Sequence, residues 1–362
     1  MKLLLPLFLL SNALIAQLDS IYNQANYRTF IVHLPTGYNT NNQYPLVLNL
    51  HGLRANAEQQ QTYSQFDDVA DQNGFIVIYP NGTGESWSTI GNKDIDFLTH
   101  LVDSIRSNYS TNDYLFVTGF SQGGFMTYKF ANNTSHSVTA IAVGSGNMSS
   151  ASQTASENAP QIPMIHFHGT TDNTVPYDGT SPFIPPVENT IQWWVNHNNC
   201  NTTPIITNMP DLDPNDNSTV EKYYYGNGNN DSEVTFYKVI GGGHTWSGSY
   251  SIPIFGATNQ DINQSKIIGD FFYDICSTIT GFEQSSIEST SNIYPNPFNE
   301  LLIVNSSKTA TIEIYNSVGI SVLKETVQNA KNIDTRGLHP GIYFYQITQS
   351  QNLLESGKLI KE

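Results

Sequence analysis

Residues 114–124 read YLFVTGFSQGG, and a helical pattern that begins at Phe125 follows them directly. The apolar half of this stretch predicts a buried strand, and Gly119, Ser121 and Gly123 form a G-x-S-x-G pattern between the strand and the helix. So tight a turn needs glycines because a side chain at either flank would collide with the neighbouring strand or helix. The turn lifts the hydroxyl of Ser121 clear of the backbone, and we predict that Ser121 is a nucleophile.

Strand-like and helix-like patterns alternate on both sides of this stretch. Nearly continuous apolar runs, typical of strands buried on both faces of a parallel sheet, occur at 29–34, 46–50, 75–79, 114–118, 138–143, 164–167, 220–225 and 234–240. Apolar residues at helical spacing lie at 66–70, 95–109, 187–195 and 268–275. The order predicts an α/β fold, a mostly parallel sheet with helices on both faces, whose site lies at the carboxyl ends of the strands.

A serine hydroxyl needs a base and an orienting carboxylate before it can attack a carbonyl carbon. With this turn, the partners follow in the order serine, acid, histidine. Asp172 lies on the loop after the run 164–167, and His244 follows three glycines after the run 234–240. The gaps of 172 − 121 = 51 and 244 − 172 = 72 residues each accommodate about one β-α-β unit. We therefore predict a Ser121–Asp172–His244 triad, with Asp178 as the competing acid.

The oxyanion of a tetrahedral intermediate needs two backbone N–H donors. One predicted donor is Gln122, directly after the nucleophile at the start of the helix. The other should come from the loop after the run 46–50, which reads His51-Gly52-Leu53-Arg54, and Leu53 is our candidate.

With these residues identified, the region from about Arg28 to Ile275 resembles the secreted α/β-hydrolases grouped as polyhydroxybutyrate depolymerases and feruloyl esterases (carbohydrate esterase family 1). The resemblance is carried by six motifs taken in order, namely PLVLNLHG at 45–52, YPNG at 79–82, DIDF at 94–97, GFSQGG at 119–124, HGTTD at 168–172 and GHTW at 243–246. It implies the α/β-hydrolase fold and puts the triad on the same three residues. The chain departs from the family at Leu53, where many members carry a cysteine, and at Ser247, where proline is common.

Two composition breaks divide the chain into a predicted esterase domain at 17–276, a Ser/Thr/Glu-rich linker at 277–291 and a domain at 292–362. In the last segment, apolar residues alternate with period two, which predicts a small all-β sandwich. It resembles the sorting domain of type IX secretion through YPNPF at 294–298, GIYF at 341–344 and KLIK at 358–361. The resemblance implies an export address read by the secretion machinery. A carbohydrate-binding or adhesive sandwich is the alternative.

The first residues suggest a second export signal. Met1-Lys2 is followed by a short apolar run and then by small residues, the pattern of a signal peptide that we expect to span residues 1–16, with cleavage after Ala13 as the alternative. No later stretch approaches the apolar length of a membrane span. The formal net charge is −16 and no basic cluster occurs, which argues against nucleic acid or anionic lipid as a partner. We expect a secreted protein, either extracellular or on the cell surface.

The two cysteines, Cys200 and Cys276, are expected to form a disulfide in an oxidising compartment, with buried free thiols as the alternative. No CxxC spacing supports a metal site. The Asp/Asn-rich stretch 211–216 lacks the spacing and the glycine of an EF-hand and is interpreted as a solvated loop. We expect no metal and no organic cofactor.

These observations predict a secreted serine carboxylesterase acting on polymeric esters. Trp87 and Trp246 lie on loops near the predicted site and could form aromatic walls for a feruloyl ring or a sugar face, or could simply pack. We favour feruloyl or acetyl esters on plant polysaccharide such as xylan. A polyhydroxyalkanoate or other polyester depolymerase is the alternative, a peptidase is possible on the same scaffold, and a non-catalytic extracellular binding protein is the alternative of another class.

Overall fold

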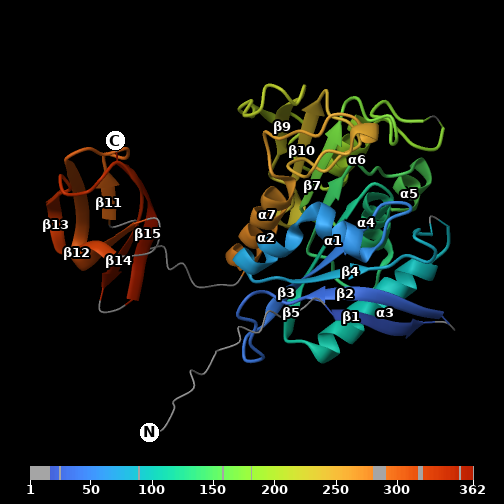
Figure 1. The fold of residues 1–362 in the computed structure, drawn as a ribbon, viewed down its shortest axis with the longest axis horizontal. Helices are drawn as coiled ribbons and strands as arrows, with labels where there is room; N and C mark the ends of the chain where they lie inside the picture. Colours follow the sequence, from blue (N-terminus) through green and yellow to red (C-terminus); the bar gives the residue numbers. More distant parts are fainter. Residues whose placement is uncertain are drawn as a thin grey trace, which may run out of the picture. The chain divides into compact units, whose positions relative to one another are not determined.

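The computed structural model describes residues 17–23, 26–88, 90–156, 159–180, 182–279, 291–316, 321–349 and 352–361. These residues fall into two compact units, which divide between Ile279 and Thr280. The predicted signal peptide at 1–16 lies outside the described residues. The first unit ends at Ile279, and the described residues of the second begin at Ser291 (Figure 1).

One sheet of ten strands forms the frame of the first unit, in the order β1-β2-β4-β3-β5-β6-β7-β10-β9-β8. Its six central strands, from β4 to β10, run parallel, and antiparallel pairs close both edges. The bounds are β1 Gln17–Asn23, β2 Asn26–His33, β3 Tyr44–Leu50, β4 Ile76–Pro80, β5 Thr111–Phe120, β6 Ala140–Gly144, β7 Met164–Gly169, β8 Ile205–Asn208, β9 Thr219–Tyr225 and β10 Val234–Ile240. The parallel centre agrees with the α/β prediction.

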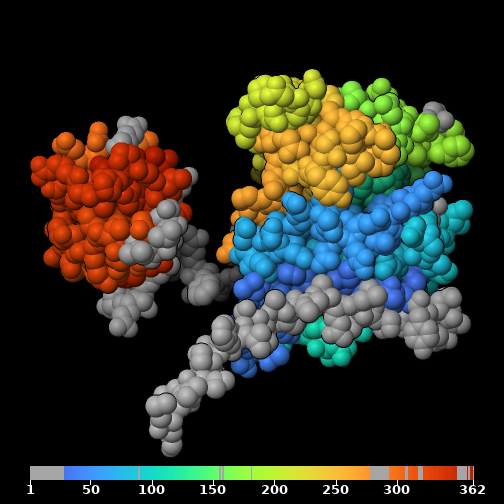
Figure 2. All heavy atoms as spheres, in the orientation of Figure 1, coloured from blue at the N-terminus to red at the C-terminus, as the bar shows by residue number. Residues whose placement is uncertain are grey.

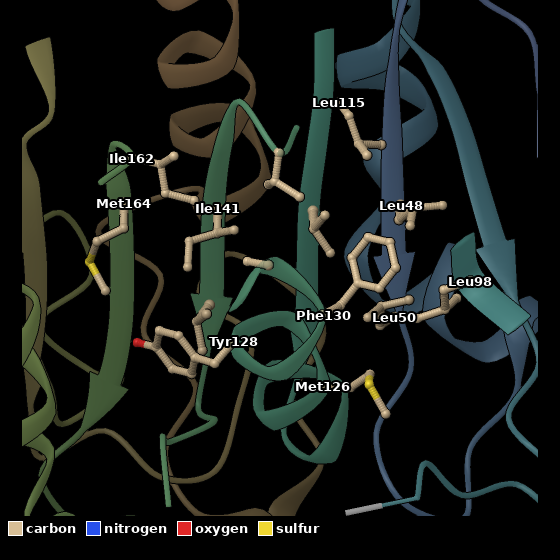
Figure 3. Close-up of a cluster of buried hydrophobic side chains, with 14 of the residues drawn as sticks. Leu48, Leu50, Leu98, Leu115, Met126, Tyr128, Phe130, Ile141, Ile162 and Met164 are labelled. Atoms are coloured by element: carbon tan, nitrogen blue, oxygen red, sulfur yellow. The ribbon is translucent and has the colours of Figure 1, made fainter. Parts of the chain in front are cut away.

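Helices cover both faces of this sheet because its central strands are apolar on both sides. The helices are α1 Ala57–Ser64, α2 Phe66–Asn73, α3 Lys93–Asn108, α4 Gln122–Asn133, α5 Ser150–Ala155, α6 Val187–His197 and α7 Gln264–Ile279. Side chains of α3, α4 and α6 share one core with alternate strand residues such as Leu48, Ile141 and Met164 (Figure 3). Those of α1, α2 and α7 share a second core with the intervening strand residues. The fold is that of an α/β-hydrolase.

Elements with strong apolar periodicity were predicted close to their observed bounds. Gly74 adopts φ 72° as the left-handed cap of α2. Helix α1, with the sequence AEQQQTYS, carries almost no apolar stripe and was not predicted. It is held instead by a capping box at Asn56 and by contact with the sheet.

The expected disulfide is wrong, because Cys200 and Cys276 are both buried and no bridge joins them. Cys200 belongs to the core on the α6 side of the sheet, and Cys276 belongs to the core on the α7 side. The central sheet therefore separates the two sulfur atoms. Burial raises the pKa of Cys276 to about 12, so this thiol stays protonated.

Helix α7 also shifts a predicted boundary. It continues to Ile279, so the first three positions of the predicted 277–291 linker are helical. The middle of that linker lies outside the described residues.

The second unit is all-β, as predicted, and consists of one antiparallel sheet of five strands. They are β11 Ser291–Tyr294, β12 Leu301–Asn316, β13 Ser321–Asp334, β14 Gly341–Gln349 and β15 Asn352–Lys361. The long strand β12 pairs with β11 and β13 in its first half and with β13 and β14 in its second. An irregularity between Ser306 and Ala310 marks the change, and both halves contribute to one apolar core.

Candidate active site

The strand–turn–helix around Ser121 has the strained geometry that its sequence predicts. Ser121 adopts φ 56° and ψ −120° between β5 and α4, in the left-handed range that a non-glycine residue rarely occupies. Its N–H donates to Gly144 O at 2.9 Å. A Cβ at Gly119 would lie 2.5 Å from Gly123 O, and one at Gly123 would overlap Leu50 O. Both glycines are therefore required for the close approach of β3, β5 and α4.

Asp172 and His244 are hydrogen bonded, although 72 residues separate them. His244 Nδ1 and Asp172 Oδ2 are 2.7 Å apart, and both side chains are buried. The other carboxylate oxygen of Asp172 accepts the N–H groups of Thr174 and Val175, each at 2.8 Å. These bonds fix the carboxylate in its turn after β7. Asp178, the competing acid, is exposed.

The glycines before His244 allow its loop to approach a second loop. A Cβ at Gly243 would overlap Phe255 O, and the His244 N–H donates to the same carbonyl at 2.7 Å. The ring of His244 lies between Phe120 and Phe255. Since Nδ1 is bonded to Asp172, Nε2 is the ring nitrogen left for the cavity.

A chain of buried polar side chains lies behind Asp172, and we did not predict it. His168 Nε2 is 3.4 Å from Asp172 Oδ2 and 2.8 Å from Val175 O. His168 Nδ1 is 3.2 Å from His166 Nε2, and His166 Nδ1 is 2.7 Å from the Tyr128 hydroxyl. Burial lowers the pKa of His168, and that of His166 well below its usual range, so both rings are neutral. The sequence did carry a sign of this chain, because two histidines alternate with apolar residues in the buried strand Ile165-His166-Phe167-His168.

The two predicted oxyanion donors are free to bind a ligand. Within the described part of the chain, neither Leu53 N–H nor Gln122 N–H donates to a protein acceptor. Leu53 follows β3 and Gln122 opens α4 directly after Ser121. One N–H group therefore lies on a loop and the other at the start of a helix, both at the carboxyl end of the sheet, where Ser121, Asp172 and His244 also lie.

A cavity of about 800 Å³ opens over these residues and includes Ser121 and His244 in its wall. Most of the wall is apolar or aromatic, and much of it comes from two segments far apart in sequence, 52–63 and 250–255. Figure 2 shows the corresponding regions lying against each other, and Trp246 N–H donates to the Tyr63 hydroxyl across this boundary. The exposed side chains of Leu53, Tyr250 and Ile254, which we call the apolar rim, surround the opening.

The two tryptophans predicted to contact substrate do not line this cavity. Trp246 is buried against Phe120, and its indole N–H donates to Ser265 Oγ at 2.9 Å. Trp87 is also buried, and its indole N–H donates to His51 O at 2.8 Å. A tryptophan on a loop can turn its ring into the core and find a hydrogen-bond acceptor there, and contact of either tryptophan with substrate stays a prediction. Trp87 does form part of a smaller neighbouring cavity.

A polar network fixes the loop that carries Trp87. Arg28 and Asp94 form a buried ion pair at 2.7 Å, and Asp94 Oδ2 also accepts the Ser88 N–H at 2.5 Å. The side chain of Gln122 accepts the Trp87 N–H at 3.0 Å. The residue after Ser121 therefore contacts the 86–88 loop through its side chain and leaves its own N–H free.

The Asp/Asn-rich stretch 211–216 forms hydrogen bonds with neighbouring protein groups. Asp216 accepts from Ser218 and Gln260, and Asp261 accepts from the N–H groups of Leu212 and Asp213. Over the described ranges, no three His, Cys, Asp or Glu side chains cluster as metal ligands. No described helix combines the length and hydropathy needed to cross a bilayer.

Two family models match the chain. Residues 292–362 match the secretion system C-terminal sorting domain, which confirms the interpretation of the second unit and indicates export. Residues 85–201 match the phospholipase/carboxylesterase family, a range that includes Ser121 and Asp172 and ends before His244.

The curated relatives are esterases. A bifunctional acetylxylan esterase/xylanase of Neocallimastix patriciarum is 32% identical over 161 residues, which is 43% of this chain and 23% of that protein. Feruloyl esterase C of Emericella nidulans is 26% identical over 164 residues, 43% of this chain and 59% of that protein. The chain thus spans less than two thirds of the length of either relative.

A solved acetyl xylan esterase from Aspergillus awamori superposes with a TM-score of 0.48 at 18% identity, covering 63% of this chain and 94% of that one.

Proposed function

We propose that this α/β-hydrolase with a C-terminal secretion sorting domain is an exported serine carboxylesterase that hydrolyses feruloyl or acetyl esters on plant polysaccharide such as xylan. The observation that carries the proposal is the convergence of Ser121, on its strained turn, with the buried His244–Asp172 pair at one cavity. The N–H groups of Leu53, on the loop after β3, and of Gln122, at the start of α4, have no acceptor among the described residues.

The proposed mechanism follows from these groups. Ser121 Oγ attacks the ester carbonyl while His244 Nε2 takes its proton. Asp172 holds His244 in the tautomer with a proton on Nδ1 and stabilises the imidazolium that forms. The N–H groups of Leu53 and Gln122 bind the oxyanion, an interaction for which removal of one donor costs about 10²–10³ in rate. His244 then returns the proton to the leaving alcohol, and water hydrolyses the acyl-enzyme by the same steps.

The cavity supports a feruloyl group as the acyl part. An aromatic acid of that size gains from burial against apolar walls, at about 25 cal/mol per Å² of apolar surface removed from water. An acetyl group would fill only a small part of a cavity of about 800 Å³. The names of the relatives, acetylxylan and feruloyl esterases, also favour sugar esters over the polyester alternative.

The test is the hydrolysis of methyl ferulate by the purified protein, compared with its Ser121→Ala variant. The proposal expects turnover by the wild type and a fall of about 10⁶ in kcat in the variant. Ser107→Ala, at an exposed position on α3, is the matched control and should leave the rate unchanged.

Other outcomes point to other functions. Turnover of acetylated xylo-oligosaccharide without turnover of methyl ferulate would restrict the proposal to acetyl esters. Turnover of a hydroxybutyrate oligomer alone would overturn the sugar-ester assignment and retain the serine mechanism. Equal behaviour of the wild type and Ser121→Ala on every ester would identify a binding protein.

A further inference from the structure

We propose that the smaller cavity beside the active site is a subsite for a carboxylate, carried by a uronic-acid residue of the polysaccharide. This inference rests on the proposed function and specifies its substrate more closely. The cavity has a volume of about 180 Å³, and its wall includes Trp87, Phe125 and Lys129.

This cavity continues the larger one. Gln122, Phe125 and Ile184 contribute to the walls of both cavities. Gln122, Phe125, Met126 and Lys129 lie at helical spacing on one face of α4, so the small cavity follows the helix away from Ser121. From Gln122 to Lys129 the helix rises about 10 Å, which places the ammonium group beyond the reacting carbonyl and within reach of a substrate that extends along α4.

The wall of the small cavity suits one polar ring with a negative group. Ser149 and Ser152 contribute hydroxyl groups, which are hydrogen bonded to each other at 2.9 Å, while Phe125 and the exposed Phe183 provide aromatic surface. Lys129 Nζ donates to Ser88 O at 3.0 Å and to Gly91 O at 2.6 Å. An ammonium group has three donors, so these two carbonyls fix its position and leave one N–H for a ligand.

The charges around the two cavities indicate that the ligand of the subsite is an anion. The chain has 31 acidic residues and 15 basic ones, yet none of the described Asp or Glu residues lines either cavity, whereas Arg54 and Lys129 do. Among the residues that the structure describes, neither cation has a carboxylate partner within salt-bridge distance. Asp94, whose charge acts on Lys129, is already paired with Arg28 at 2.7 Å. The joined cavities therefore form a positive region in a strongly negative protein, which attracts an anionic substrate.

A carboxylate can reach this subsite from two sources. One is a uronic-acid side group next to the esterified sugar, and the other is the free end of a hydroxyacid oligomer. The hydroxyls and aromatic rings around Lys129 favour the sugar, because ring faces stack on aromatic surfaces and sugar hydroxyls need hydrogen-bonding partners.

The experiment compares four esters, namely methyl ferulate, a feruloylated neutral xylo-oligosaccharide, the same oligosaccharide carrying one glucuronic acid, and a hydroxybutyrate trimer with a free carboxylate. We expect kcat/KM to be about tenfold higher for the uronate-bearing ester than for its neutral counterpart, as one hydrogen bond to a charged group implies. Lys129→Met should abolish this preference and leave methyl ferulate turnover within twofold. Lys266→Met, which removes an exposed lysine on α7, is the matched control and should keep the preference.

A second measurement does not depend on the variant folding. The preference of the wild type should shrink as sodium chloride rises from 50 to 500 mM, because salt screens the ammonium charge. A wild type without the preference, or a Lys129→Met variant that retains it, overturns the subsite. If only the hydroxybutyrate trimer is cleaved faster than methyl ferulate, and Lys129→Met loses this difference, the subsite binds the free carboxylate of an oligomer. That result overturns the assignment to a uronic acid. If the wild type hydrolyses none of the four esters, the proposed function is wrong. Failure of the proposed function can therefore be distinguished from failure of the subsite.

Discussion

Two regions that meet at Ser121 are built in opposite ways. The acid–base side, formed by Asp172, His244 and His168, is buried, and its polar atoms have short hydrogen bonds to named partners. The apolar rim of Leu53, Tyr250 and Ile254 is exposed by 56%, 50% and 86%. The groups proposed for proton transfer are held in one arrangement by many contacts, whereas the groups proposed to meet the substrate depend on few. We therefore expect substitutions on the two sides to affect different kinetic constants.

The largest effect is expected at the carboxylate. Asp172→Asn keeps the shape of the side chain but donates to His244 Nδ1 rather than accepting from it, so the ring is held in the wrong tautomer. We expect kcat for methyl ferulate to fall by about 10⁴, with KM nearly unchanged. Asp178→Asn, at the exposed competing acid, is the control, and an equal loss in both variants would contradict the assignment.

The acid–base side should also make the fold sensitive to acid. His166 and His168 are buried and neutral, with their pKa values lowered by burial, whereas the unfolded chain binds a proton at each below about pH 6.5. The unfolded state therefore binds more protons, and lowering the pH below 6.5 favours it. We expect the free energy of unfolding to fall by up to about 1.4 kcal/mol per pH unit for each histidine. A melting temperature that stays constant from pH 7 to pH 5 would contradict this.

His168 should act on the reaction through Asp172. His168→Phe retains a ring in the buried position but leaves Asp172 Oδ2 and Val175 O without their imidazole partner. We expect kcat to fall by about tenfold, a change typical of groups that orient a reacting residue, and the acid limb of its pH profile to shift. A purely structural role would lower the melting temperature and leave the pH profile unmoved. His136→Phe, at a partly buried position away from the site, is the control.

The smallest effect is expected on the apolar rim. Ile254→Ser removes exposed apolar surface that a bound feruloyl group would cover. We expect KM for methyl ferulate to rise about fivefold and kcat to stay the same, as the loss of roughly 1 kcal/mol of apolar contact implies. Ile205→Ser, at another exposed isoleucine that does not line the cavity, should change neither constant. A fall in kcat in Ile254→Ser would contradict the expectation that the apolar rim acts on substrate binding and the acid–base side on the reaction.

The difference between the two regions also explains what the sequence could predict. Gly119, Gly123 and Gly243 are required by close backbone approaches, so a short motif identifies the positions of Ser121 and His244. The alternating strands and helices follow from apolar periodicity, because each face of the sheet has its own core.

The rest depends on contacts between distant segments. Whether Trp87 faces the cavity is decided by the acceptor at His51 O, and the rim forms only when 250–255 meets 52–63. The cysteines illustrate the same limit, since an even number predicts a pair but not the sheet that separates them. Lys129 lies on a helix that the sequence predicts, and yet only the fold places it beside a cavity.

The absence of a disulfide between the two buried cysteines has a practical consequence. Because no bridge joins Cys200 to Cys276, the first unit reaches its fold without an oxidation step. It can therefore be produced in a reducing cytoplasm and assayed in the presence of dithiothreitol. With both sulfur atoms buried and Cys276 protonated up to about pH 12, thiol-directed labels should react with neither until the fold opens, so their uptake provides a simple probe of unfolding.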